Sequence, residues 1–408
     1  MTSELGTRLA DLRPDGPDEM GRELAEGPAA VEATLAVVER LRPQLDRARD
    51  EASRLLLVGT GASLAMVLAA APLFRAAEAA RTAAGAPDET GSGAADAAVS
   101  GTPAGAAAAR RERPVVVVEA SSVLLAPTGE ERFVRGDLVV VVSQSGTSPE
   151  TLAAALRARA AGATVLAVTA AAGSPLAEAG QLVLHTPSGP EAGAATKSEL
   201  AALAALAALA GVLPCDAAVA ARLRASLEAV VADPAAVVPA GLALGRAAHA
   251  WAVGFGSAAG FARAATLLLH EKALLVTVPG TPSEFRHGPI EAVGPGDAVL
   301  LVETDPPDPG RAAYLALLAG ELTELGVPLI AIGRAPLPAG RLTVPVPKLP
   351  LADRARGAER AGGADAALLL HTLLRIQQVS RLAAHARGTY RDGFRVLRTI
   401  VGAAGDLA

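Results

Sequence analysis

Residues 137–152 read DLVVVVSQSGTSPETL and join an apolar run to a loop rich in hydroxyl groups. The run at 138–142 is short, continuous and mostly β-branched, which predicts a strand covered on both faces. Ser148 suits the N-cap of a following helix and Pro149 its first position, so free backbone N–H groups and the positive end of the helix dipole face the loop. The side chains available there are those of Ser143, Gln144, Ser145, Thr147 and Ser148. The stretch predicts an anion site, for a phosphate ester, rather than only a polar turn above a sheet.

A second group of reactive side chains lies in residues 258–291. A helix there ends in HEKALLV, and a loop reading PGTPSEFRHGPIEAV follows it. Glu271 and His287 reach one pocket if this loop folds back over the helix end. A carboxyl and an imidazole form an acid–base pair near neutral pH, because burial raises the pKa of a carboxyl group. The alternatives are a solvated helix glutamate paired with an arginine, and a histidine that only completes a turn.

Two other features carry weaker signals. The turn GTGAS follows an apolar run, so Gly61 allows a ligand to approach the backbone and Ser63 offers a hydroxyl at a helix N-terminus. Tight packing of the turn explains the same pattern. His270 beside Glu271 suggests a metal ligand, but adjacent helical residues diverge by about 100° and no second ligand motif completes a set. We expect no metal site, and we expect the remaining histidines to be structural or exposed: His185, His249, His371 and His385.

Composition excludes several classes of protein. The 408-residue chain is 51% hydrophobic with only 2% aromatic residues and a formal net charge of −5, which argues against base stacking and phosphate-backbone binding to nucleic acid. Cys215 is the only cysteine, so an internal disulfide is excluded. No signal peptide is expected at the N-terminus, and apolar runs such as 200–210 are too short to span a bilayer. The sequence predicts a cytoplasmic protein without a membrane segment.

Strands alternate with helices along the chain, which predicts an α/β fold with parallel sheets. The pattern of residues 55–63, 137–142 and 162–166 returns at 250–257, 297–302 and 326–330, which predicts two copies of one domain. The second copy has Glu303-Thr304-Asp305-Pro306-Pro307 where the first has its hydroxyl loop. Carboxylates repel phosphate, so we expect one phosphate site in the chain.

The remaining segments are expected to connect and cover these domains. Residues 82–113 are rich in alanine and glycine, which predicts a disordered insertion. A helical hairpin is expected near the N-terminus, with Leu24, Val31, Leu35, Val38 and Leu41 on one face. A closing helix at 364–386 should pack across both domains. The predicted boundaries are an N-terminal helical segment at 1–48, a first domain at 49–213, a linker helix at 214–240, a second domain at 241–385 and a tail at 386–408.

These motifs together resemble the sugar isomerase (SIS) family, which includes the isomerase half of glutamine–fructose-6-phosphate aminotransferase and amino-sugar-phosphate deaminases and deglycases. The resemblance spans roughly residues 20–380. It rests on these stretches: MGRELAEGP, GTGAS, SQSGTSPET, ATKSEL, GFGSAAGFARAATLLLHEKA and EFRHGP. It implies two tandem flavodoxin-like domains with parallel sheets, N-terminal helices and a C-terminal tail, a homodimer with sites at its interface, a phosphorylated sugar substrate and no cofactor.

The resemblance also implies roles for individual residues. The phosphate loop corresponds to Ser143, Gln144, Ser145 and Ser148. Ser63 corresponds to a sugar-contacting serine, and Gly61, Thr196 and Lys197 lie in matching motifs. Glu271 falls at the position of a proton-shuttling glutamate and His287 at that of a ring-opening histidine.

The chain departs from the aminotransferase pattern. Met1 is followed by Thr2, and we expect no glutaminase domain. Ala264 and Leu268 replace a glutamate and a lysine, and the tail reads GTYRDGFRVLRTIVG without a lysine. Tyr390, Arg391 and Arg395 are in a position to close the site. The sequence therefore predicts an isomerase, deaminase or deglycase acting on an amino-sugar 6-phosphate or glycated amine phosphate. The alternatives are a non-catalytic sugar-phosphate sensor and a synthase subunit fed ammonia by a separate glutaminase.

Overall fold

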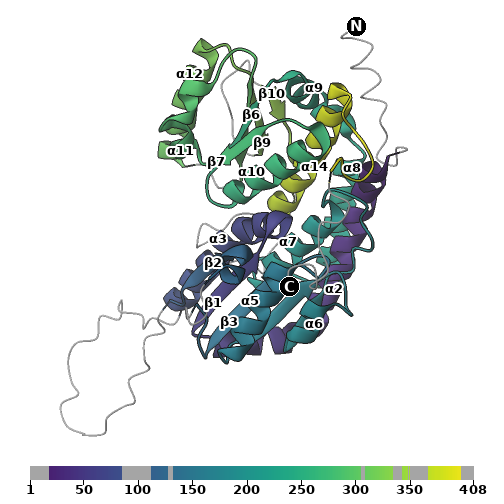
Figure 1. Cartoon of the computed structure of the whole chain (residues 1–408), viewed down its shortest axis with the longest axis vertical. Coiled ribbons are helices and arrows are strands. Elements are labelled where there is room, and N and C mark those ends of the chain that lie inside the picture. The colour runs from purple at the N-terminus through teal and green to yellow at the C-terminus, as the bar shows by residue number, and fades with distance from the viewer. Residues whose placement is uncertain are drawn as a thin grey trace, which may run out of the picture.

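The computed structural model describes residues 18–84, 112–126, 132–304, 308–333, 342–347, 349 and 366–396. Two lobes, each built on a five-stranded parallel sheet, lie one above the other (Figure 1). The first sheet contains β1(Arg54–Gly59), β2(Val115–Glu119), β3(Asp137–Val142), β4(Thr164–Thr169) and β5(Leu182–His185). The second contains β6(Ala250–Gly254), β7(Thr277–Gly280), β8(Ala298–Glu303), β9(Leu329–Gly333) and β10(Leu342–Val344). The strand orders β2-β1-β3-β4-β5 and β7-β6-β8-β9-β10 are the same, and this is the order of flavodoxin-like folds.

Helices cover the sheets and join the lobes. The helices of the first lobe are α3(Gly61–Ala84), α4(Ala120–Leu124), α5(Pro149–Ala160), α6(Pro175–Ala179) and α7(Lys197–Leu209). α8(Ala217–Val231) and η1(Pro234–Val237) connect to the second lobe, which contains α9(Val238–Arg246), α10(Ser257–Leu268), η2(Leu269–Ala273), α11(Pro282–Arg286), η3(Pro289–Ala292) and α12(Pro309–Glu324). α14(Ala366–Arg387) follows.

The alternation of side chains along each strand divides the core. In β1, Leu55 and Leu57 belong to the large central cluster, whereas Leu56 and Val58 pack in a separate cluster with the apolar face of α5. The second sheet has the same arrangement, with Trp251 and Val299 packed against α12 on its outer side. The central cluster contains residues from the inner faces of both sheets, so one continuous core joins the lobes.

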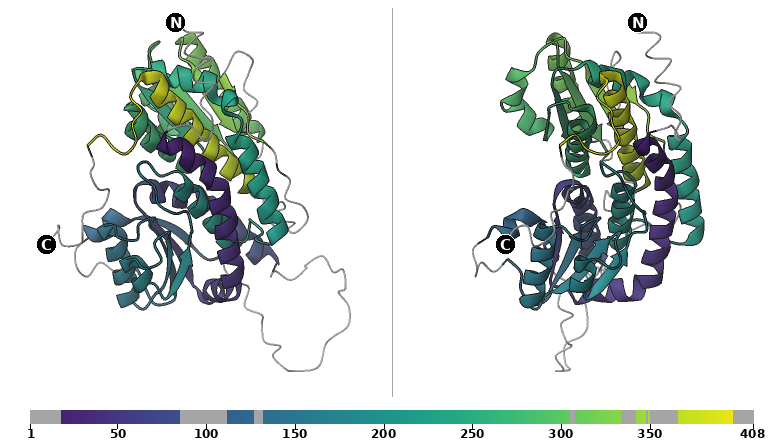
Figure 2. Two further views of the ribbon diagram at one scale, coloured as in Figure 1. Left: turned by 90° about the vertical axis from the view of Figure 1, so that its right-hand side faces the viewer. Right: turned by 45° about the vertical axis from the view of Figure 1, so that its right-hand side comes forward.

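The expectation of a helical hairpin near the N-terminus is wrong. Residues 19–51 form one 33-residue helix, α2(Glu19–Glu51), that continues through Pro28 and Pro43. It runs beside α14 and α8 and down the first lobe (Figure 2). Its N-cap Asp18 accepts a 2.7 Å hydrogen bond from Gly21 N and is ion-paired with Arg381 of α14. Packing along the helix therefore outweighs the two prolines, each of which removes one backbone hydrogen bond.

The contact between α3 and α10 brings the lobes together closely. A Cβ atom on Gly260 of α10 would lie 2.4 Å from Ala69 N and 2.6 Å from Ala65 O of α3. Only glycine lets the two backbones approach this closely. α14 contacts α2, α7 and α8 as well as α9 and α10, which confirms that the closing helix packs across both lobes.

Other expectations are corrected. The segment after η2 was predicted as a loop but contains β7 and α11, and β10 was not predicted. Residues 61–83 of α3 have the length and hydropathy of a membrane span, as do α8 and the η1–α9 segment taken together. The expectation that the apolar runs are too short to span a bilayer therefore does not hold for these segments. α3 nevertheless packs on β1, α7 and α10. Of the predicted insertion, residues 85–111 lie outside the described residues, as do Asp305, Pro306 and Pro307.

Candidate functional site

The hydroxyl loop occupies the predicted place between β3 and α5 and is held firmly on one side. Gly146 O accepts a 3.0 Å hydrogen bond from Leu176 N, and Gln144 O accepts one of 3.1 Å from Ala170 N. Gly146 has φ +64°, and a Cβ atom there would lie 2.0 Å from Ser174 Oγ. Glycine is thus required at position 146 both by its backbone angle and by space.

The hydroxyl groups of this loop lie close to the free N-terminus of α5. Ser148 is the N-cap and Pro149 begins the helix, as predicted, but the Ser148 side chain makes no capping hydrogen bond. Its Oγ instead lies 3.5 Å from Ser143 Oγ, which also accepts a 3.2 Å hydrogen bond from Gly146 N. The first-turn N–H groups of α5 are therefore left without a side-chain cap, which is the arrangement that binds an anion.

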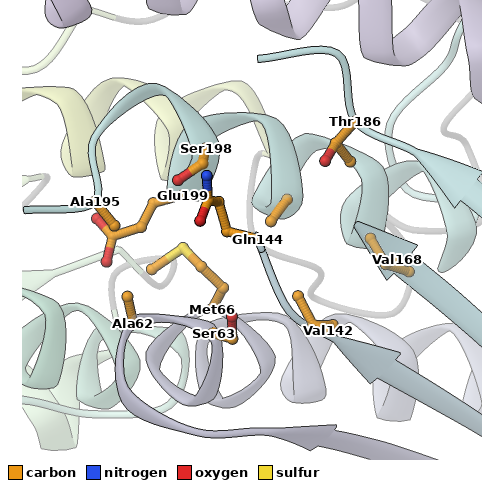
Figure 3. A pocket seen from close by; sticks show the side chains of 11 residues that line it. Ala62, Ser63, Met66, Val142, Gln144, Val168, Thr186, Ala195, Ser198 and Glu199 are labelled. Atoms are coloured by element: carbon orange, nitrogen blue, oxygen red, sulfur yellow. The ribbon is translucent and has the colours of Figure 1, made fainter. Parts of the chain in front are cut away.

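A pocket lies beside this loop (Figure 3). Its walls are the first turns of α3 and α7 and the carboxyl ends of β3 and β4. The lining residues are Ala62, Ser63, Met66, Val142, Gln144, Val168, Thr186, Ala195, Ser198, Glu199 and Ala202. In a flavodoxin-like sheet the strand order reverses between β1 and β3, and ligands bind at that point.

The pocket brings together only some of the residues predicted to bind substrate. Ser63 and Gln144 line it, whereas Gly61, Ser143, Ser145 and Ser148 do not. Their part in substrate binding stays a prediction.

Thr196 and Lys197 hold α7 to its surroundings. Lys197 is buried and forms an ion pair with Glu26 of α2. The Thr196 hydroxyl donates to Glu23 and to Glu191, at 3.0 Å in each case. Neither residue lines the pocket. The structure therefore places both side chains where they fix the first turn of α7, next to the lining residues Ser198 and Glu199.

Glu199 was not predicted from the sequence. Its side chain is 4% exposed, and its Oε2 atom accepts a 3.2 Å hydrogen bond from Gln377 Nε2 of α14. Burial raises the pKa of Glu199 well above its usual value; the Gln377 hydrogen bond opposes the rise, and the nearby charges of Glu191 and Glu271 add to it. The carboxylate of Glu271 therefore acts electrostatically on a residue that lines the pocket.

Glu271 lies on an irregular end of α10. η2 is a π-helical turn, and Leu274, which follows it, is the one non-glycine residue with positive φ in the described part of the chain, at 49°. Such turns and strained residues cluster at functional sites. Burial raises the pKa of Glu271 to about 7, against the opposing effect of the positive charge on Lys272. The carboxyl group is therefore able to accept and return a proton near neutral pH.

Lys272 ties this turn to the C-terminal tail. Its Nζ donates hydrogen bonds to Arg391 O at 3.2 Å and Gly393 O at 3.0 Å and lies 5.6 Å from the centre of the Tyr390 ring. A Cβ atom on Gly193 would lie 2.6 Å from this Nζ. The tail therefore packs directly next to Glu271. The side-chain roles expected for Tyr390, Arg391 and Arg395 in closing the site stay predictions.

His287 is placed differently from Glu271. It follows α11 as its C-cap, is exposed, and its side chain makes no hydrogen bond with the described residues. Neither His287 nor Glu271 lines the pocket. His270, by contrast, has Nε2 within 2.9 Å of Thr277 N and 3.0 Å of Thr277 O, which fastens η2 to β7.

Comparison with known proteins identifies the first lobe. Residues 113–211 match the family described as SIS domain. The chain contains a SIS domain. It is 33% identical over 196 residues to a glutamine–fructose-6-phosphate aminotransferase (isomerizing) of Pyrobaculum aerophilum, across 43% of this chain and 31% of the relative. It is 34% identical over 182 residues to the enzyme of the same name from Symbiobacterium thermophilum, across 41% of this chain and 30% of the relative. The chain thus spans about a third of the length of these curated relatives.

Solved structures share the fold over most of the chain. The C-terminal domain of a glucosamine-fructose-6-phosphate aminotransferase from Francisella tularensis superimposes with a TM-score of 0.65 at 18% identity, covering 92% of this chain and 98% of that one. A tagatose-6-phosphate ketose/aldose isomerase from Escherichia coli superimposes with a TM-score of 0.68 at 16% identity, covering 94% and 98%. At these identities the likeness shows a common fold.

The matched SIS domain contains one part of the site. The hydroxyl loop and the first turn of α7 fall within residues 113–211. Ser63 precedes the matched segment, and Glu271 and His287 follow it. The residues predicted to bind substrate therefore lie mostly in the matched segment, whereas the predicted acid–base residues Glu271 and His287 lie in the second lobe.

Proposed function

We propose that this protein is a sugar-phosphate isomerase or an amino-sugar-phosphate deaminase or deglycase. The observation that carries the proposal is Glu271, a half-buried carboxyl whose pKa is raised to about 7 and whose charge acts on Glu199, in the lining of the pocket beside the hydroxyl loop. A proton carrier of this kind next to an anion site is what an aldose–ketose proton transfer requires.

In the proposed reaction, Ser143, Ser148 and the N–H groups of α5 hold the phosphate. Glu271 removes the proton from one of the two reacting carbons and returns it to its neighbour, through an enediol or an enolamine. In a plain isomerase the proton returns and no group is lost. In a deaminase or deglycase, an enolamine becomes an imine, water adds to the imine carbon, and the amine leaves.

We also propose that the protein acts as a homodimer. His287 is exposed and away from the lining of the pocket. The resemblance to SIS proteins with sites at a dimer interface supports a role for His287 in ring opening at the site of a second copy. Mixing Glu271→Gln and His287→Ala chains, each inactive alone, tests this, because mixed dimers regain activity only if the two residues act across the interface.

A synthase subunit that receives ammonia from a separate glutaminase is the second proposal. It is favoured by the sequence match to two aminotransferases whose names describe an isomerising reaction. A non-catalytic sensor is the outcome if sugar phosphates bind without turnover.

One assay panel separates these functions. The protein is incubated with hexose 6-phosphates, hexosamine 6-phosphates and glycated amine phosphates. The release of ammonia or of a free amine is measured, together with the formation of ketose or aldose phosphate. Ketose without ammonia indicates an isomerase, ketose with ammonia indicates a deaminase, and aldose with a free amine indicates a deglycase. Amination that requires added ammonia indicates a synthase subunit. Binding without turnover of any compound contradicts the enzyme proposal.

A further inference from the structure

Glu199 is the one ionisable side chain in the lining of the pocket. The other lining residues are neutral and come from α3, α7 and the ends of three strands. Glu199 lies on the first turn of α7, beside Ser198 and facing the space between α3 and α7 (Figure 3). More than nine-tenths of the side chain is buried.

This carboxyl group has no cationic partner among the residues that the structure describes. Gln377 Nε2 donates to Oε2 and also to Thr196 O, at 3.2 and 2.9 Å. The Oε1 atom has no hydrogen bond with the described residues. The two lysines that the structure describes have other partners, since Lys197 pairs with Glu26 and Lys272 donates to the tail.

The charges that face Glu199 from the surrounding elements are also negative. Glu191, in the segment before α7, and Glu271, on η2, both oppose its ionisation. Glu23 of α2 lies behind Thr196, where it accepts hydrogen bonds from Ala192 N and from the Thr196 hydroxyl. Burial of an ionised carboxyl without a paired cation is costly, so it raises the pKa of Glu199 and favours the protonated carboxyl.

We propose that Glu199 selects substrates that carry a positively charged nitrogen, which it binds as an ion pair at the α7 side of the pocket. This inference rests on the proposed function, since it names the group that the bound sugar phosphate carries. A cation in the pocket supplies the missing partner of Oε1 and stabilises the ionised carboxylate. The proton of Glu199 then leaves to solvent as the ion pair forms, so binding of a cationic ligand releases a proton.

The test compares glucosamine 6-phosphate with glucose 6-phosphate, which differ by an ammonium group in place of a hydroxyl. Titration calorimetry at about pH 6, in buffers of different ionisation enthalpy, counts the protons released on binding. The ammonium is protonated at this pH, and burial favours the protonated form of Glu199. Proton release from the phosphate is common to the two ligands, so the difference between them reports Glu199. We expect about one additional proton and tighter binding for the amino sugar, by at least about tenfold.

Glu199→Gln keeps the shape of the side chain and removes its charge. In this variant we expect the additional proton to vanish and the preference for the amino sugar to fall by about tenfold or more, with glucose 6-phosphate affinity nearly unchanged. Glu178→Gln, which removes an exposed acid of α6 outside the pocket, is the matched control and should behave as wild type. Even if the variant does not fold, the difference in proton release between the two ligands in the wild-type protein tests the role of Glu199.

Two outcomes overturn the inference in distinguishable ways. Equal affinity for both ligands with equal proton release rejects the role of Glu199 and leaves the proposed function standing. No binding of either sugar phosphate rejects both.

Discussion

The two sheets have the same strand order, yet their carboxyl ends are chemically different. After β3, six residues rich in hydroxyls lead into α5, whose N-cap Ser148 makes no side-chain cap. After β8 come Glu303 and Thr304, and Glu303 pairs with Arg311 of α12 at 3.3 Å. The N-terminus of α12 is already occupied, because Asp308 accepts a 2.9 Å hydrogen bond from Arg311 N. The first turn of α5 therefore has no side-chain cap on its N–H groups, whereas the first turn of α12 has one.

The difference suggests that two lobes of the same topology have different roles in binding and in proton transfer. The first lobe contains the hydroxyl loop and every residue that lines the pocket. The second has no hydroxyl-rich sequence after β8 and carries Glu271, the proposed proton carrier, at the π-helical end of α10. α10 crosses α3 at Gly260, so the lobe that carries the acid–base group is fastened to the lobe that forms the pocket. The comparison predicts that changes in the first lobe alter affinity and changes in η2 alter turnover.

Replacing Glu271 with Gln gives the largest expected effect. The variant keeps the size of the side chain but cannot accept a proton, so we expect turnover to fall by about 10³-fold. The affinity for sugar phosphate, measured by calorimetry, should change little. Glu291→Gln, an exposed acid of the same lobe, serves as the control and should keep wild-type activity. Turnover of the Glu271 variant at the wild-type rate would show that the second lobe does not supply the proton carrier.

Removing two hydroxyl groups of the hydroxyl loop tests whether the first lobe alone binds the phosphate. In the double variant Ser143→Ala with Ser148→Ala we expect affinity for the sugar phosphate to weaken by about 10- to 100-fold, because hydrogen bonds to a charged group are lost. Thr304→Ala removes the hydroxyl at the corresponding place after β8 and should leave affinity unchanged. If both changes weaken binding alike, the two lobes share the phosphate and the asymmetry proposed here is wrong.

Changing the pH should alter activity less than these substitutions do, and the pKa of Glu271 gives the direction of the change. The pKa of Glu271 is raised to about 7, and the base must be ionised, so activity is present above this pH and is lost as the pH falls through it. We expect kcat/KM to fall about tenfold per pH unit on the acid side. The substrate phosphate titrates near pH 6, and its contribution is separated by measuring binding to Glu271→Gln over the same range. An acid limb near pH 4.5 would indicate an exposed, unperturbed carboxyl.

Local sequence patterns predicted much of the fold. The runs at 138–142, 55–58 and 163–168 are short, apolar and continuous, which is typical of strands covered on both faces. All three form strands. β7 was missed because TVPG is short and contains proline and glycine, which predict a turn. The unbroken α2 was missed because Pro28 and Pro43 ordinarily end helices, and only the packing of the finished core overrides them.

The site was less accessible to sequence reasoning. The hydroxyl loop is local and was recognised, and the resemblance located Glu271. Glu199 carries no local signal, since its hydrogen-bond partner Gln377 is 178 residues away and the pocket forms only when α7 meets α3 and α14. The burial of Lys272 likewise depends on a tail that follows it by more than a hundred residues. Contacts that depend on tertiary packing leave no pattern in a single sequence.

The smallest predicted effect concerns the contact that joins the compared lobes. In Gly260→Ala, the new methyl group meets the backbone of α3 at Ala69 and Ala65, so the helices must separate. We expect a loss of about 1–3 kcal/mol in the free energy of unfolding, measured by denaturant titration. Gly320→Ala is the matched control, because Gly320 also lies within a helix but has open space around it. There the substitution should stabilise the protein by about 0.5–1 kcal/mol, since alanine is the better helix former. If the two variants gave the same change in stability, close packing of α10 on α3 could not be what holds the second lobe, and Glu271 with it, against the pocket of the first.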